Sequence, residues 1–253
     1  MTKENLNKTK KKKGLFFKLM KATISGFYGK VNHVGIENIP NEPCIIVGNH
    51  AQINGPIIAE MRSPFPHYTW CIGDMLHLKE FPSYAFQDFW RYKPKWTHWF
   101  YKMLSYILAP LGTYIFKNAD VIGVYNDMRT VSTFKNSTKI LKEGNHLIVF
   151  PEKHEAFNHI INEFKDKFVD LARLFHKETG KELSFVPMYI APKLKTVIYG
   201  KPIKFNNNIN IGEERKKVCD YLKSEITILA QSLPAHTVIP YANIPKKLYP
   251  KSK

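Results

Sequence analysis

A chain of 253 residues, of which 44% are hydrophobic and 13% aromatic, is long enough for one α/β domain and too apolar for a disordered protein. Its formal net charge of +17 favours anionic partners: phospholipid headgroups, nucleic acid or phosphate-bearing substrates. Three scattered cysteines without CxxC spacing argue against a disulfide framework and for a reducing compartment.

The N-terminal segment is rich in lysine. Residues 1–13 predict a disordered basic tail. Apolar residues at mostly helical spacing over 14–30, with Lys18 and Lys21 beside them, predict an amphipathic helix that contacts an anionic membrane surface. The alternative is a surface helix packed on the domain, with its lysines simply solvated.

The apolar run at 44–47 predicts a buried strand, and His50 follows it after Gly48 and Asn49. Open α/β sheets place their chemistry just beyond such strand ends. A second strand, at 146–150, likewise ends on a polar residue, Glu152, which indicates one shared cleft. The alternative is that His50 caps a helix or stabilises a turn.

Residues 83–116 combine many aromatic residues with lysine and arginine. This composition is typical of a membrane-interface belt, and it also suits a platform for single-stranded nucleic acid. The alternative is a core in which the aromatic residues pack internally. The longest uncharged apolar stretch, 104–116, is shorter than the roughly 20 residues that a membrane-spanning helix needs.

Strand and helix patterns alternate along the rest of the chain. This alternation predicts a single α/β domain over 31–233, in which helices flank a central mixed, largely parallel sheet. The Pro- and Lys-rich tail, 234–253, is predicted to wrap the surface. A strand and turn are expected at 31–40, a strand and loop at 121–129, and further strands at 68–73, 184–190 and 196–199. Helices are expected at 57–61, 131–143, 160–175 (ended by Gly180) and 218–229.

Four short blocks occur in order, with the turn sequence GIENIP before the first. The blocks are Asn49-His50, a loop arginine at Arg129, Phe150-Pro151-Glu152 and Val186-Pro187. In these features, over residues 31–205, the chain resembles the glycerolipid acyltransferase family, whose best-known members acylate lysophosphatidic acid. The resemblance implies that His50 is a general base and that an Asp five positions after it holds its ring.

The chain departs from the family pattern in two places. The Asp position holds Gly55, and the third block continues Lys153-His154-Glu155 where the family has Gly-Thr-Arg. We predict that Asn54, on the same helical face as His50, accepts the ring N–H instead of the Asp. The other carboxylates that could serve are Glu60, Asp74 and Glu152.

The substrate-binding residues also follow from the resemblance. Arg129 is predicted to pair with a phosphate of the acceptor or of CoA, unless it is an ordinary surface arginine. Glu152 is predicted to contact an acceptor hydroxyl or to orient a loop. Lys153 and His154 would replace the missing arginine as phosphate contacts, unless they are plain loop residues, and Asn49 completes the set. No metal site and no cofactor are expected.

The resulting hypothesis is a peripheral enzyme at the cytoplasmic face of a membrane. It would move a fatty acyl group from acyl-CoA or acyl carrier protein to the hydroxyl of a lysophospholipid-like acceptor. One alternative is a lipid-binding protein on the same fold that has lost catalysis, which Gly55 motivates. A single-stranded nucleic-acid binder is the other, although no nucleic-acid motif occurs and no stable nucleic-acid partner is expected.

Overall fold

The computed structural model describes residues 13–253, apart from the side chains of residues 154–156. The predicted disordered tail therefore lies outside the described residues except for Lys13. The Lys13 ammonium group pairs with the Asp120 carboxylate at 2.6 Å.

Eight of the described strands form the central sheet, in the order β1-β9-β8-β2-β5-β3-β4, with β10 also paired to β8. The strands β8, β2, β5, β3 and β4 run parallel to one another, whereas β9 and β10 are antiparallel to β8. The predicted mixed, largely parallel sheet is confirmed. The strands are β1 (Asn32–Val34), β2 (Cys44–Gly48), β3 (His67–Ile72), β4 (Val121–Val124), β5 (His146–Val149), β8 (Ser184–Ala191), β9 (Thr196–Tyr199) and β10 (Ile203–Lys204).

Helices cover both faces of this sheet. From β2, Ile45 and Val47 pack in one core with residues of α5, α6 and α7, while Cys44 and Ile46 pack in another with α2. This two-sided burial explains why the strand reads as a continuous apolar run. The helices are α1 (Leu15–Tyr28), α2 (Asn54–Arg62), α3 (Phe81–Ala85), α4 (His98–Asn118), α5 (Thr130–Lys142), α6 (Asp170–Thr179) and α7 (Ile211–Ser232).

The segment 160–175 differs from the predicted single helix. Strands β6 (Glu152–Phe157) and β7 (Asn162–Phe164) form a separate antiparallel pair, and α6 begins only at Asp170. Asn158 sets the turn between them, because its Oδ1 accepts the N–H groups of Ile160 and Ile161 at 3.0 and 2.8 Å. The predicted helix end at Gly180 is confirmed, with a left-handed φ of 70°.

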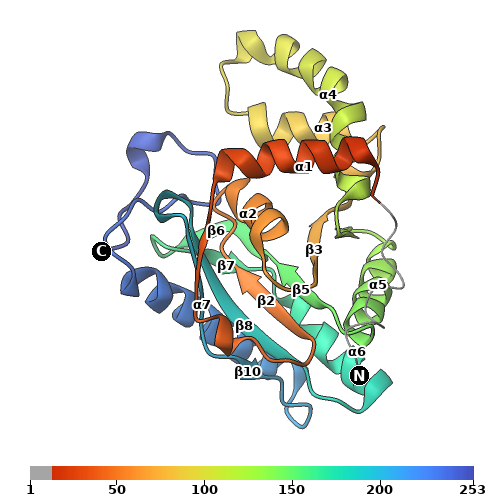
Figure 1. Ribbon diagram of the computed structural model, residues 1–253, viewed down its shortest axis with the longest axis vertical. Helices are drawn as coiled ribbons and strands as arrows, with labels where there is room; N and C mark the ends of the chain where they lie inside the picture. Colours follow the sequence, from red (N-terminus) through yellow and green to blue (C-terminus); the bar gives the residue numbers. More distant parts are fainter. Residues whose placement is uncertain (1–12) are drawn as a thin grey trace.

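Helices α3 and α4 project beyond the sheet, and α1 lies beside them (Figure 1). The Phe16 ring of α1 contacts the Tyr114 ring of α4, with 5.5 Å between the centroids. Across the residues that the structure describes, no helix combines the length and the apolar character needed to cross a bilayer.

Candidate functional site

His50 lies directly after β2, at the carboxyl ends of the parallel strands. The residue is only partly buried, and its ring contacts two aromatic rings. The centroid distances are 5.6 Å to Phe150 and 4.9 Å to Tyr241. Phe150 follows β5, the neighbour of β2 in the sheet. The structure thus brings the two predicted strand-end motifs together.

A backbone carbonyl group orients the His50 ring. The ring Nδ1 is hydrogen-bonded to the main-chain oxygen of Gln52. Because a carbonyl oxygen can only accept a hydrogen bond, Nδ1 must carry the proton. In the neutral ring, Nε2 is therefore the nitrogen with basic character.

Asn54 does not orient the ring, so this prediction is wrong. Its Nδ2 donates to the Ala51 carbonyl at 2.9 Å, and its Oδ1 accepts from the Tyr28 hydroxyl at 3.2 Å. The cause lies in the chain after His50, which forms a turn before α2 begins at Asn54. The i+4 geometry of a continuous helix therefore does not apply to this pair.

The turn after His50 has an unusual backbone. Ala51 and Gln52 have positive φ angles of 45° and 55°, a region that non-glycine residues rarely occupy. Two such residues in succession cost about 1–2 kcal/mol each, so the surrounding contacts must hold the turn. The N–H of Gly55 donates to the His50 carbonyl at 3.0 Å and closes the turn.

Gly55 sits too close to this turn to carry a side chain. A Cβ atom at residue 55 would lie 2.5 Å from the His50 carbonyl oxygen and 2.7 Å from that of Asn49. Both neighbours are backbone atoms, which cannot rotate away as a side chain can. The packing thus requires a glycine here, and this turn leaves no room for a carboxylate at residue 55.

Glu152 holds the backbone of the site in place. Its two carboxylate oxygens accept the backbone N–H groups of His50 and Asn162, at 2.6 and 2.9 Å. The side chain is only 4% exposed, and burial raises the pKa of the carboxyl group from 4.5 to about 7, against the lowering effect of the two hydrogen bonds. Of the two predicted roles, these hydrogen bonds agree with the orientation of a loop, and the contact with an acceptor hydroxyl stays a prediction.

Asn49 has a similar structural role. Its Oδ1 accepts the N–H of Ile190 at 2.7 Å, and its Nδ2 donates to the carbonyl of the same residue at 3.0 Å. These two bonds tie the end of β2 to β8, and the side chain is buried. The amide is thus used within the protein, and the role of Asn49 in substrate binding stays a prediction.

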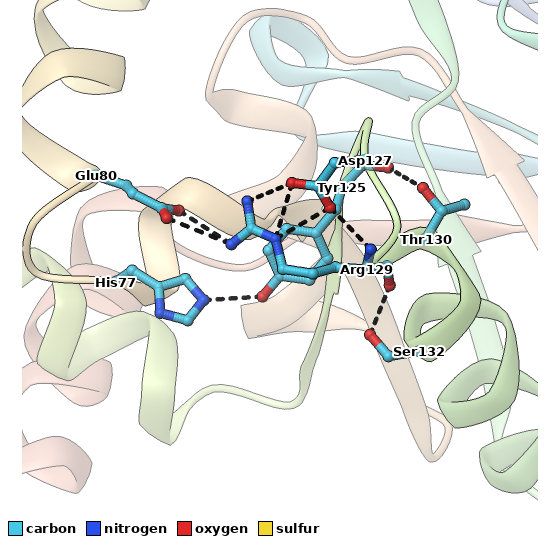
Figure 2. A network of polar contacts seen from close by, with 7 residues as sticks. All are labelled: His77, Glu80, Tyr125, Asp127, Arg129, Thr130 and Ser132. Carbon is cyan, nitrogen blue, oxygen red and sulfur yellow. Dashed lines mark hydrogen bonds and ion pairs between the residues drawn. The ribbon is translucent and has the colours of Figure 1, made fainter.

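Arg129 belongs to another polar network, which Figure 2 shows. Its guanidinium pairs with Asp127 at 2.8 Å and Glu80 at 3.3 Å, and it lies 4.2 Å from the Tyr125 ring centroid. The hydrogen bonds from Arg129 lower the pKa of the Asp127 carboxyl group, so this partner stays ionised. Two carboxylates thus pair with the arginine at the start of α5, and its role as a phosphate contact stays a prediction.

Two predicted residues lie on β6, directly after Glu152. Lys153 is partly buried, and the side chain of His154 lies outside the described part of the structure. Their role as phosphate contacts stays a prediction. Within the described residues, no group of three or more His, Cys, Asp or Glu side chains is arranged to hold a metal ion.

The structure adds residues to the site that the sequence analysis missed. Gln52 supplies the carbonyl that holds His50, and its Nε2 donates to the Tyr249 hydroxyl at 2.8 Å. Tyr241 packs on the His50 ring. Both tyrosines come from the C-terminal tail, which is remote from His50 in the sequence, and no local spacing signals such a contact.

Comparisons with known proteins show a structural likeness. No protein-family model and no curated protein matches the sequence. The crystal structure of the 1-acyl-sn-glycerophosphate (LPA) acyltransferase PlsC from Thermotoga maritima is similar at 17% sequence identity, with a TM-score of 0.48. The match covers 84% of this chain and 80% of that chain. At this identity, no residue role passes from that protein to this chain.

Proposed function

We propose that the protein is an acyltransferase, which moves a fatty acyl group from acyl-CoA or acyl carrier protein to the hydroxyl of a lysophospholipid-like acceptor. The observation that carries this proposal is the His50 ring, which is held by a carbonyl at Nδ1 and belongs to a partly exposed residue beside the Phe-Pro-Glu turn. A general base for acyl transfer requires an imidazole that is held in one orientation.

The proposed reaction uses His50 in two proton transfers. Nε2 takes the proton of the acceptor hydroxyl while the hydroxyl oxygen attacks the thioester carbonyl. The tetrahedral intermediate then expels the thiolate, which takes the proton back from the imidazolium, and an ester and a free thiol are formed. The Gln52 carbonyl keeps Nδ1 protonated throughout, but it lacks the full charge with which a carboxylate stabilises imidazolium.

A substrate panel tests the proposal. Purified protein is incubated with labelled acyl-CoA or acyl carrier protein and a series of lysophospholipids, and both ester and free thiol are quantified. We expect one acceptor or more to give ester and thiol in equal amounts. If folded protein forms no ester with any pair, the proposal fails.

A lipid-binding protein without turnover is the second candidate. The packing around Gly55 favours it, because residue 55 cannot supply the charge that an imidazolium would need. This candidate predicts binding to lysophospholipid-containing liposomes with no release of thiol in the same panel. The two readouts, binding and turnover, therefore separate the two functions.

We also propose that α1 and α4 attach the protein to the cytoplasmic face of an anionic membrane. Several apolar side chains of both helices are exposed, among them Leu15 (83%) and Phe27 (87%) on α1, and Trp99 (69%) and Ile107 (63%) on α4. Residues 89–119 contain five lysines or arginines and no acidic residue. Exposed aromatic and aliphatic side chains among cations suit a surface of anionic headgroups, whereas a second copy of the chain would bring like charges together.

Replacing the exposed apolar residues of α4 tests this attachment. We expect the double variant Trp99→Ser and Ile107→Ser to bind anionic liposomes at least about tenfold more weakly, since two side chains lose their burial in the interface. Co-sedimentation with vesicles of phosphatidylglycerol measures it. Ile228→Ser, at an exposed site on α7, is the matched control and should leave binding unchanged. Unchanged binding of the double variant, or a preference for single-stranded nucleic acid over vesicles, contradicts the proposal.

A further inference from the structure

The C-terminal tail, 234–253, is firmly anchored on the domain. His236 is 5% exposed, and its Nε2 is hydrogen-bonded to the Tyr189 hydroxyl of β8 at 2.9 Å. Val238 is fully buried in the main core. The far end returns to the same place, because the N–H of Ser252 donates to the His236 carbonyl at 3.0 Å. The tail is therefore a closed loop whose two ends are held together.

The middle of this loop lies against the turn that follows His50. Tyr241 packs on the His50 ring at 4.9 Å. The Gln52 side chain donates to the Tyr249 hydroxyl at 2.8 Å and to the Ala242 carbonyl at 3.4 Å. Elsewhere in the loop, Asn243 donates from Nδ2 to the Asp88 carbonyl at 2.7 Å. The tail thus connects the His50 turn to the segment that joins α3 and α4.

The backbone of the turn needs this support. Ala51 and Gln52 occupy the left-handed region, and in that conformation the Gln52 carbonyl reaches Nδ1 of His50. Ala51 is held by its burial and by two hydrogen bonds to its carbonyl, from the backbone and side-chain N–H groups of Asn54. Gln52 is held by its side chain, whose amide donates to the hydroxyl and the carbonyl of the tail.

We infer that Gln52 is the positioning residue of His50 and that the C-terminal tail, through Tyr249 and Ala242, completes the site by fixing it. In this arrangement the Gln52 carbonyl, whose position is fixed by hydrogen bonds from the Gln52 side chain to the tail, sets the tautomer of His50. A side-chain carboxylate could otherwise have this role. The inference rests on the proposed function and deepens it, because it names what orients the base. It also applies to the ring alone, whatever reaction the ring serves.

Two variants of the 253-residue chain test the inference. Tyr249→Phe removes the hydroxyl that accepts from Gln52, and Gln52→Ala removes the whole side chain. Tyr221→Phe is the matched control, since it also removes one tyrosine hydroxyl that is hydrogen-bonded, at 3.0 Å to the Lys201 carbonyl, outside the site. The first readout is the ¹⁵N spectrum of the histidine rings at a pH where His50 is neutral, with the His50 signals identified by their loss in His50→Ala.

We expect the wild-type His50 ring to carry its proton on Nδ1. In Tyr249→Phe and Gln52→Ala the Nε2–H tautomer should become populated, and kcat for acyl transfer should fall roughly 3- to 10-fold, the effect of one lost hydrogen bond. The Tyr221→Phe control should change neither. The inference is overturned if the His50 spectra of both variants match that of the control, or if wild-type His50 is protonated on Nε2.

The two readouts keep this inference separate from the proposed function. A shift of the tautomer in both variants, in a protein without measurable acyl transfer, would support the positioning role and contradict the acyltransferase proposal. Acyl transfer that is unaffected in both variants, with an unchanged tautomer, would leave the acyltransferase proposal standing and contradict the role of Gln52.

Discussion

Placing a side chain at residue 55 is expected to damage the protein rather than improve it. In Gly55→Ala the new methyl group would lie 2.5 Å from the His50 carbonyl oxygen, so the turn that carries His50 must move. We expect a loss of roughly 1–3 kcal/mol in the free energy of unfolding, as for other overpacked sites. Displacement of the base by about 1 Å should lower acyl transfer about 100-fold. Gly55→Asp, which adds a larger and charged side chain at the same place, should do the same.

Urea unfolding and the acyl-transfer rate measure these two effects. The matched control is Gly26→Ala on α1, where an added Cβ meets no atom within 4 Å. This control should raise the free energy of unfolding by about 0.5–1 kcal/mol, since alanine is the better helix former. A Gly55→Asp variant that is more active than the wild type would show that the turn accepts a carboxylate, and the packing argument would then be wrong.

Glu152→Gln is expected to change how stability depends on pH. The pKa of the Glu152 carboxyl group is about 7 in the folded protein and 4.5 in the unfolded chain. Between these pH values the folded state therefore binds one proton more than the unfolded state. The free energy of unfolding therefore falls as the pH rises from 4.5 through 7, by roughly 3 kcal/mol from this group. The amide of the variant would not titrate, and it would leave one of the two backbone N–H groups without an acceptor, at a cost of about 1–3 kcal/mol.

Urea unfolding of both proteins at pH 5 and at pH 8 checks this expectation. The variant should be the less stable protein at pH 5, and its disadvantage should shrink or disappear at pH 8. Glu213→Gln, which removes the same charge from an exposed site on α7, controls for the change in net charge. A disadvantage that grows with pH would mean that Glu152 is ionised throughout and stabilises the site as an anion.

The sequence predicted the parts of the site that depend on local pattern. The apolar run of β2 and the similar run of β5 located two adjacent strands, and the residues that follow them, His50 and Phe150, are in contact. Strands that are buried on both faces are easy to recognise in a sequence, because every position must be apolar.

Neither the backbone of the turn after His50 nor the contact of His50 with the C-terminal tail could be predicted in this way. The predicted partner of His50 was Asn54, on the assumption of a helix that begins at once, but the chain first makes a left-handed turn at Ala51 and Gln52. The residue types of that turn do not predict positive φ angles, since neither residue is glycine or asparagine. The packing of Tyr241 on His50 depends on how the C-terminal tail folds back onto the domain, and no periodicity of the sequence predicts this.

Arg129 shows a different limit of sequence analysis. The arginine does follow a strand, as predicted, but its function depends on charge partners. Asp127 is only two positions away and was available in the sequence as a competing partner, whereas Glu80 comes from a distant segment. A nearby acidic residue is thus a useful warning against assigning an arginine to a phosphate.

The rate of ester formation by His50→Ala tests the central claim most directly. With the acceptor identified in the substrate panel, wild type and variant are compared at saturating acyl donor, with His33→Ala as a control at another partly exposed histidine. If His50 is the general base, its loss should lower the rate at least about 100-fold while His33→Ala keeps the wild-type rate. Ester formation by His50→Ala at the wild-type rate would contradict the claim.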